Sequence, residues 1–317
     1  MNDKKIKIVF FGTPEFAVES LKKLLDSGFD VAAVVTMPDK IAGRGHKMIE
    51  SDVKKFAVSR NLKVLQPANL KSPEFIDELK NINADLFIVI AFRMLPEAVW
   101  QMPPMGTFNL HASLLPDYRG AAPINWAVIN GDKETGVTTF FLKHEIDTGD
   151  IIQQKKITIT DKDNVGTVHD RLMILGADMV VETVKEIEQG NVKTFPQPEG
   201  EHRTAPKIFK DTCKIDWNKP AKDIHNLVRG LSPYPGAWTT MTDYRNPDKV
   251  TDIKIFETRM SDVDLPSLTP GKCIIMPNRF FVCTGDKPLE IISLQPAGKR
   301  RMESSAFLQG YTPDKFN

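Results

Sequence analysis

The chain has 317 residues and a formal net charge of +1; 41% of its residues are hydrophobic and 26% are charged. This composition is typical of a folded globular protein of about two domains, and it excludes collagen, coiled coils and long disordered chains. Three cysteines without a CxxC pair fit a reducing compartment and argue against a structural zinc site. We recognise neither a signal peptide nor an apolar run near the ~18 residues of a membrane span, so we expect a cytoplasmic protein.

Apolar runs and helical patterns alternate through the first half of the chain. Short continuous apolar runs are typical of buried parallel strands, which we expect at Ile6–Phe11, Val31–Val35, Lys63–Leu65, Asp85–Ala91 and Thr107–His111. Helical spacing of apolar residues predicts helices at residues 16–25, Val53–Val58, Pro73–Leu79, Pro123–Val128 and Val165–Ile187. The β-rich runs Thr135–Leu142 and Ile151–Ile159 are expected to pair. This alternation predicts an α/β fold with a parallel sheet.

The pattern changes at residues 190–206, where proline, glycine and charged residues predict a linker. Beyond it, one helix near Ala221–Arg229 accompanies short β-rich runs that predict a small β-barrel, with strands at Ile253–Thr258, Gly271–Ile275, Arg279–Cys283 and Leu289–Leu294. Residues 1–206 hold 25 Lys and Arg against 28 Asp and Glu, a net −3, whereas residues 207–317 hold 17 against 13, a net +4. The excess of positive charge in residues 207–317 fits either an ordinary solvated surface or a basic module that contacts a polyanion such as RNA.

No phosphate-binding sequence follows the first expected strand. Gly12-Thr13-Pro14-Glu15 lacks the GxGxxG spacing of dinucleotide sites, and the chain has no Walker A sequence. This turn either only starts the first helix or also lines a ligand site at the carboxyl ends of the strands.

Asn109 and His111 belong to the densest polar cluster of the sequence. They are two residues apart on an expected strand, so their side chains share one face of the sheet. An amide and an imidazole that point the same way can orient a carbonyl group and stabilise an oxyanion, although a strand histidine can equally be structural. A rigid loop, Ser113–Gly120, follows, and a later turn carries Asp147-Thr148-Gly149-Asp150, so the Asp147 carboxylate could face His111.

The segment from Phe108 to Ile152 resembles the signature of folate-dependent formyltransferases. It carries four linked elements: Asn-x-His-x-Ser-Leu-Leu-Pro, Arg-Gly, Thr-Gly-Val-Thr and Asp-x-Gly. The resemblance runs nearly end to end, through residues 10–17, 35–45, 215–217, 229–238 and 296–302. It implies a Rossmann-like formyltransferase domain over residues 1–189 and, after the linker, a smaller OB-like β-barrel over residues 207–317.

Enzymes of this family transfer a formyl group from 10-formyltetrahydrofolate to an amine, and they use no metal. The resemblance implies a catalytic trio of Asn109, His111 and Asp147. Asn109 would donate to the formyl oxygen, and protonated His111 would stabilise the oxyanion. Asp147 would favour the imidazolium by proximity and accept the amine proton through water. The residues implied to line the folate pocket are Ser113, Leu114, Leu115 and Pro116.

The loop 39–47 and the C-terminal sequences resemble the branch of the family that formylates the α-amino group of methionine on initiator tRNA, for translation initiation. In that branch the loop enters the acceptor-stem groove of the tRNA; Arg44 matches its key arginine, with Lys40 and Lys47 nearby. The basic C-terminal part would then bind the tRNA backbone in a salt-dependent way. We expect a monomer without a membrane partner, whose substrates are this tRNA and the folate.

Three places depart from the family pattern. Phe92-Arg93 stands where Tyr-Gly is usual beside the folate pocket, so the bulk of Arg93 could change the pocket's shape. Met48–Asp52 brings two acids next to the tRNA loop, where a proline-bearing stretch is usual. Ser232 and Tyr234 replace a commoner Asn and Trp, and we expect little effect from them.

Four other functions compete with this interpretation. A formyltransferase acting on a small amine, such as an amino-sugar nucleotide, would share the trio, although the Gly-Arg-Gly loop and Lys299–Met302 favour tRNA. A formyl-folate hydrolase would also share the trio but needs no basic tail. A hydrolase using His111 as base and Ser113 as nucleophile lacks the GxSxG elbow. The last alternative, a non-catalytic RNA-binding module, is distinguished by an activity assay.

Overall fold

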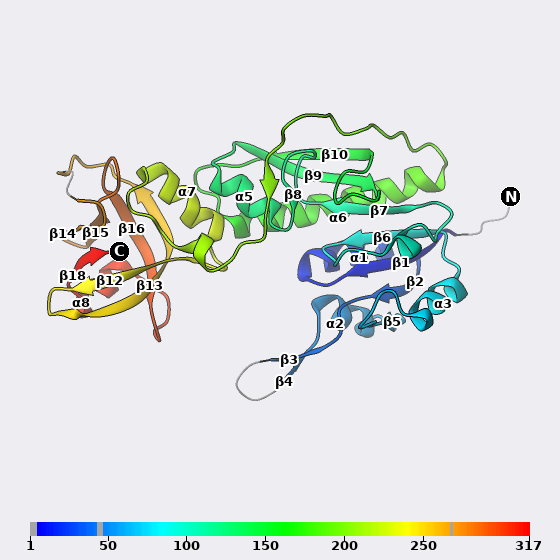
Figure 1. Ribbon diagram of the computed structural model, residues 1–317, viewed down its shortest axis with the longest axis horizontal. Helices are drawn as coiled ribbons and strands as arrows, with labels where there is room; N and C mark the ends of the chain where they lie inside the picture. The colour runs from blue at the N-terminus through cyan, green and yellow to red at the C-terminus, as the bar shows by residue number, and fades with distance from the viewer. Residues whose placement is uncertain (1–4, 43–46, 267–268) are drawn as a thin grey trace. The chain divides into compact units, whose positions relative to one another are not determined.

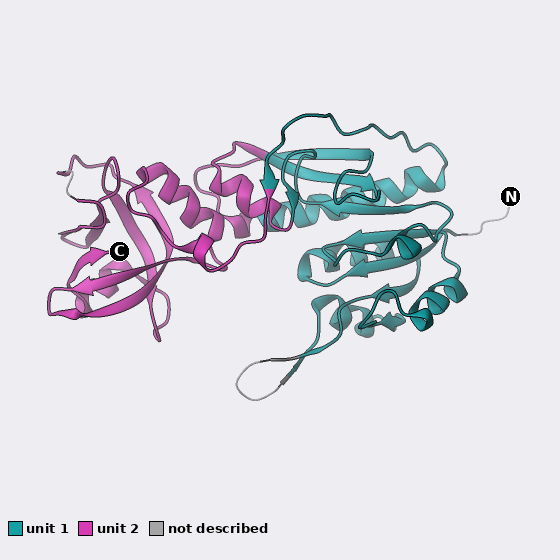
Figure 2. Cartoon of the chain, viewed as in Figure 1, with its two compact units in different colours: residues 1–120, 135–157, 169–204 teal, residues 121–134, 158–168, 205–317 magenta. Residues whose placement is uncertain are grey.

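The computed structural model describes residues 5–42, 47–266 and 269–317 (Figure 1). The chain divides into two compact units, shown in teal and magenta in Figure 2. The first comprises residues 1–120, 135–157 and 169–204, and the second comprises residues 121–134, 158–168 and 205–317. Two inner segments thus belong with the C-terminal unit, and the stretch expected as a linker belongs almost entirely to the first. The functional division at residues 189 and 207 stays a prediction.

The first unit is built on a seven-stranded sheet of order β10-β9-β7-β6-β1-β2-β5. Its strands are β1 (Lys7–Gly12), β2 (Asp30–Val35), β5 (Val64–Leu65), β6 (Leu86–Ile90), β7 (Thr107–His111), β9 (Glu134–Phe141) and β10 (Ile151–Thr158). Parallel pairing joins β5 to β2, β2 to β1, β1 to β6 and β6 to β7, whereas β9 is antiparallel to β7. The expected, mostly parallel sheet and the neighbouring β9 and β10 are confirmed.

Helices with apolar faces accompany this sheet: α1 (Glu15–Asp26), α2 (Asp52–Ser59), α3 (Pro73–Ile82), α4 (Glu97–Trp100) and α6 (Val165–Glu188). Serine caps begin two of them, because the Ser51 hydroxyl accepts from the third amide of its helix at 3.0 Å and the Ser72 hydroxyl does the same at 3.3 Å. Leu21 and Leu24 of α1 are fully buried, as the helical spacing predicted. The short helix α4 was not predicted from the sequence.

The expected loop between β2 and α2 contains two short antiparallel strands, β3 (Lys40–Ala42) and β4 (Lys47–Ile49). Their pairs join Lys40 to Ile49 and Ala42 to Lys47. Arg44 lies outside the described residues.

The second unit is built on an antiparallel sheet of order β14-β15-β16-β13-β12-β18, to which β17 adds beside β16. Its strands are β12 (Ala237–Asp243), β13 (Asn246–Met260), β14 (Cys273–Met276), β15 (Arg279–Val282), β16 (Leu289–Pro296), β17 (Met302–Glu303) and β18 (Pro313–Phe316). A bridge between Lys272 and Lys315, with the Phe316 amide donating to the Gly271 oxygen at 2.8 Å, joins the two ends of the sheet. The expected barrel-like architecture is therefore confirmed.

Aromatic side chains fill the core of the second unit: Trp217, Phe280, Phe307 and Phe316 are each at most 4% exposed. The helices of this unit are α5 (Pro123–Ile129), α7 (Ala221–Leu231) and α8 (Ser304–Gly310), and the remaining short elements of the chain are β8 (Arg119–Gly120), β11 (Thr204–Ala205) and the 3-10 turn η1 (Asp211–Cys213). Asn125 of α5 donates to the Gly230 oxygen of α7 at 2.8 Å, which fixes α5 within the second unit. Among the described residues, no helix has the length and apolarity needed to cross a membrane.

Candidate active site

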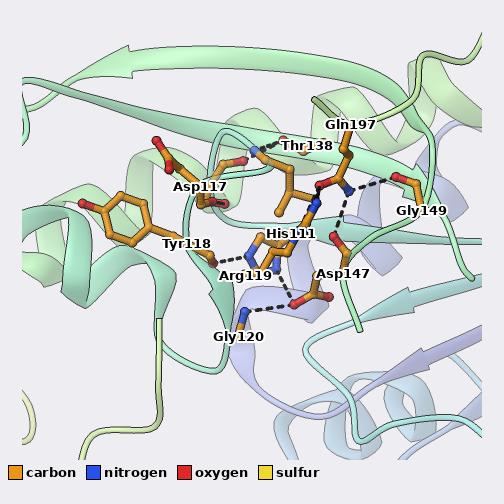
Figure 3. Close-up of polar contacts among 11 residues, drawn as sticks. His111, Asp117, Tyr118, Arg119, Gly120, Thr138, Asp147, Gly149 and Gln197 are labelled. Atoms are coloured by element: carbon orange, nitrogen blue, oxygen red, sulfur yellow. Dashed lines mark hydrogen bonds and ion pairs between the residues drawn. The ribbon is translucent and has the colours of Figure 1, made fainter. Parts of the chain in front are cut away.

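His111 is the last residue of β7, and the residue is buried, with 8% of its surface exposed. Its Nε2 lies 2.8 Å from the main-chain oxygen of Tyr118, and its Nδ1 lies 3.9 Å from Oδ2 of Asp147 (Figure 3). Because a carbonyl oxygen only accepts hydrogen bonds, Nε2 must carry a proton and donate it. Nδ1 is then the nitrogen that faces the carboxylate.

Asp147 lies in the connection between β9 and β10, where its backbone is left-handed, with φ 56°. Its Oδ2 accepts a hydrogen bond from the Gly120 amide at 3.0 Å, in addition to facing His111. A Cβ at Gly149 would lie 1.6 Å from the Phe141 oxygen, so this turn requires glycine there. A left-handed non-glycine residue costs about 1 kcal/mol or more, so its surroundings must hold Asp147 in place.

Asn109 lies two residues before His111 on β7, so both side chains extend from the same face of the strand. The Asn109 side chain is half-buried, and within the described ranges its amide has no hydrogen-bonding partner. A free amide donor beside an imidazole is suited to a carbonyl oxygen that acquires negative charge. The structure thus brings His111 and Asp147 together and leaves Asn109 available to a ligand.

The loop after β7 is held by hydroxyl groups. The buried Ser113 hydroxyl donates to the Asp117 oxygen at 2.7 Å, so it fixes the loop. The Thr138 hydroxyl on β9 donates to the Ser113 oxygen at 2.7 Å and accepts from the Leu115 amide at 3.2 Å. A serine hydroxyl engaged in this way is poorly placed to act as a nucleophile, which argues against the serine hydrolase alternative.

The residues predicted to line the folate pocket differ in exposure: Ser113 and Leu115 are buried, whereas Leu114 and Pro116 are half-buried. Their contact with folate stays a prediction. The unusual Arg93 donates through its guanidinium to the main-chain oxygens of Pro67 and Ala68. Burial lowers the pKa of Arg93, and these two carbonyl groups offset part of that burial cost.

Gln197 is a residue of this site that the sequence did not predict. Its Oε1 accepts from Nε and Nη2 of Arg119 at 3.0 and 2.6 Å, and its Nε2 donates to the oxygens of Asp147 and Gly149 at 2.8 and 2.9 Å (Figure 3). Gln197 stands between two prolines in the stretch expected as a linker. Neither periodicity nor a recognised motif marks a glutamine in that context, so only the three-dimensional contacts reveal it.

The structure describes no contact between this site and the residues predicted to bind tRNA. Lys40 is exposed on β3, Lys47 stands on β4, and Arg44 is outside the described residues. Their role stays a prediction. The parts of the chain that the structure describes contain no group of three or more His, Cys, Asp or Glu side chains that could hold a metal ion.

Comparisons with known proteins agree with this geometry. Residues 4–184 match a family model described as formyl transferase, and residues 207–312 match one described as formyl transferase, C-terminal domain. The chain is 54% identical to a methionyl-tRNA formyltransferase of Bacteroides fragilis, covering 98% of this chain and 97% of the relative. It is 48% identical to the methionyl-tRNA formyltransferase of Flavobacterium johnsoniae, with the same coverage.

Solved structures with the same fold include enzymes that act on other amines. A sugar 3N-formyl transferase has a TM-score of 0.65 and 22% identity, covering 93% of this chain and 99% of that one. An N-formyltransferase from Helicobacter canadensis, solved with folinic acid and dTDP-3-aminofucose, has a TM-score of 0.66 and 21% identity, covering 94% of this chain and all of that one. At this level of identity the likeness establishes the fold alone.

Proposed function

The chain belongs to the formyl transferase family, and from this membership we propose that it transfers a formyl group from 10-formyltetrahydrofolate to the α-amino group of methionyl initiator tRNA. The products are N-formylmethionyl-tRNA, which is used in translation initiation, and tetrahydrofolate, whose N10 takes up a proton as its bond to the formyl carbon breaks. The observation that supports this substrate is a sequence identity of about 50%, along nearly the whole chain, with relatives named for this activity. The sugar-modifying enzymes share the fold at about one fifth identity only.

The folate, when bound, supplies the formyl group, and the residues of the site fit that group. Asn109 brings an amide N–H that has no partner among the described residues, and His111 brings Nδ1, since its Nε2 is bound to the Tyr118 oxygen. Both are donors that a formyl oxygen can accept from as negative charge develops on it. We assign Asn109 to orienting this oxygen and protonated His111 to stabilising its charge.

The Met α-amine is a nucleophile once it is neutral, so the enzyme needs a proton acceptor and no covalent nucleophile. Asp147 is placed for this role, because its Oδ2 lies 3.9 Å from the His111 Nδ1 and is held by the Gly120 amide. The amine proton would pass to Asp147 through water.

The tRNA would be bound by two regions outside this site. The segment 207–317 carries a net charge of +4, and Arg44, Lys40 and Lys47 lie in the segment that joins β2 to α2. Phosphate contacts of this kind weaken as salt concentration rises. We assign the protein to the cytoplasm, as a monomer without a membrane partner.

A substrate panel tests the function. Formyl transfer from 10-formyltetrahydrofolate is measured with charged initiator Met-tRNA, uncharged tRNA, free methionine and an amino-sugar nucleotide, each at two salt concentrations. We expect product with the charged tRNA alone, and less of it at high salt. Turnover of the amino-sugar nucleotide instead of the tRNA would contradict the proposal and favour the small-amine alternative.

A further inference from the structure

The segment 195–203 contacts the main chain of the turn that carries Asp147 and the main chain of Tyr118, whose oxygen binds His111. We infer that Gln197 is a positioning residue for the His111–Asp147 pair. The inference rests on the proposed function, because the pair is taken to perform the formyl transfer. Gln197 touches neither His111 nor the Asp147 carboxylate through a described hydrogen bond. Its effect therefore has to pass through the turn that carries Asp147.

The hydrogen bonds of Gln197 use the full capacity of its side chain. The amide oxygen has two lone pairs, and both are engaged by Arg119 Nε and Nη2. The amide nitrogen has two protons, and both are donated to main-chain oxygens of the Asp147 turn. Glutamate cannot donate to those oxygens, and asparagine is one methylene shorter. Of these three side chains, only glutamine has both the length and the donors to make all four hydrogen bonds.

The Asp147 turn needs such support. Asp147 has a left-handed backbone, and the side-chain hydrogen bonds described within the connection from β9 to β10 run from the Thr148 hydroxyl to the Glu145 oxygen at 3.0 Å and from Lys143 Nζ to Asp150 Oδ1 at 2.7 Å. Gln197 adds two donors, one to Asp147 itself and one to Gly149. Without them, the Gly120 amide would still hold the carboxylate oxygen, but the main chain that carries Asp147 would lose two supporting hydrogen bonds.

The same segment also holds the partner of the other imidazole nitrogen. The Arg203 oxygen accepts from the Tyr118 amide at 2.6 Å, and the Tyr118 oxygen binds His111 Nε2. The Arg203 guanidinium pairs with Asp117 at 3.0 Å. Phe195 exchanges two main-chain hydrogen bonds with Ile151 of β10, at 2.8 and 2.9 Å. Residues 195–203 are therefore fixed to the unit at several points around the pair.

A double-mutant cycle tests the inference. We expect Gln197→Ala to lower kcat by about 10- to 100-fold, as loss of a supporting hydrogen-bond partner does, with little change in either KM. In an Asp147→Ala background the same change should cost less than about twofold, because the group it positions is gone. Gln197→Glu, which keeps the shape and the Arg119 contact, should lose as much as Gln197→Ala. The control is Gln189→Glu, an exposed position just after α6.

Equal losses in the two backgrounds would overturn the inference, as would wild-type turnover in Gln197→Ala. A second measurement needs no substrate: the imidazole ¹⁵N signals of the six histidines, with His111 assigned through His111→Gln. We expect Gln197→Ala to move the His111 signals and to leave those of His225, in the second unit, in place, which also reports that the variant is folded. Unmoved His111 signals would contradict the role of Gln197. Failure of the wild type to formylate Met-tRNA would refute the proposed function separately.

Discussion

Each compact unit buries a histidine to a similar degree, yet the two have opposite surroundings. His111 in the first unit is 8% exposed and lies between a carbonyl oxygen and the Asp147 carboxylate. His225 in the second unit is 7% exposed, with its Nδ1 2.9 Å from the Thr258 hydroxyl. Burial, followed by the nearby charge of Arg229, lowers the pKa of His225 to about 4. Burial alone therefore does not mark a functional histidine; the neighbouring charges do.

The rest of each unit repeats this contrast. In the second unit, the buried Glu290 carboxylate accepts from Arg279 at 2.8 and 2.7 Å, and the buried Trp217 ring donates to the buried Thr239 hydroxyl at 3.0 Å. In the first unit, the site leaves the Asn109 amide without a described partner and holds Asp147 in a left-handed backbone. Strain and unused hydrogen-bonding capacity are typical of a functional site, whereas saturated networks are typical of a structural one.

Removing the carboxylate should have the largest effect. We expect Asp147→Ala to lower kcat by at least ~100-fold, because the proton acceptor and the charge facing His111 are lost together. Single-turnover formyl transfer to Met-tRNA measures this, with Asp77→Ala on the exposed face of α3 as the control. Turnover near that of the wild type would remove Asp147 from the chemistry and erase the difference between the two histidines.

The pH dependence of stability should be next in size. Unfolded His225 binds a proton near pH 6.5, whereas the folded unit binds it only near pH 4, so the free energy of unfolding falls as the pH drops through this window. From pH 7.5 to pH 5 we expect a loss of about 2 kcal/mol. Urea unfolding at both pH values, followed by the fluorescence of the second unit's tryptophans, measures it. An undiminished loss in His225→Gln would show that another group is responsible.

A substitution in the loop 39–47 should have the smallest effect, and that effect should be confined to tRNA binding. We expect Arg44→Ala to raise the KM for Met-tRNA by about tenfold, equivalent to about 1.4 kcal/mol of binding free energy, and to leave the KM for folate unchanged. Steady-state kinetics with each substrate varied in turn provide the comparison. Equal changes in both KM values would refute the assignment of this loop.

Much of the fold was predictable because its signals are local. Buried strands such as Leu86–Ile90 are continuous apolar runs, and the sequence predicted them within a residue or two. Strand β12 (AWTTMTD) was missed because its threonines and single methionine give a weak alternation. The charged first half of β13 was missed as well, since its exposed residues are ordered by pairing with β12 rather than by burial.

The site was predicted only in part, for a related reason. Asn109 and His111 share a strand, so their relation follows from a period of two residues. The glycine-bearing turn suggested that Asp147 could face His111, and resemblance to a family supplied its catalytic role. Gln197 acts through contacts with residues 48 to 78 positions away in the sequence, and Tyr118 contacts His111 through its main-chain oxygen. A main-chain oxygen carries no sequence signal, so this half of the site needed the structure.

The most direct test of the account is to compare the two buried histidines in one assay. Single-turnover formyl transfer from 10-formyltetrahydrofolate to charged initiator Met-tRNA is measured at pH 7.5 for His111→Ala and His225→Gln. We predict a loss of at least ~100-fold for His111→Ala and less than about threefold for His225→Gln. Similar rates for the two variants would contradict the claim that the carboxylate-facing histidine performs the chemistry.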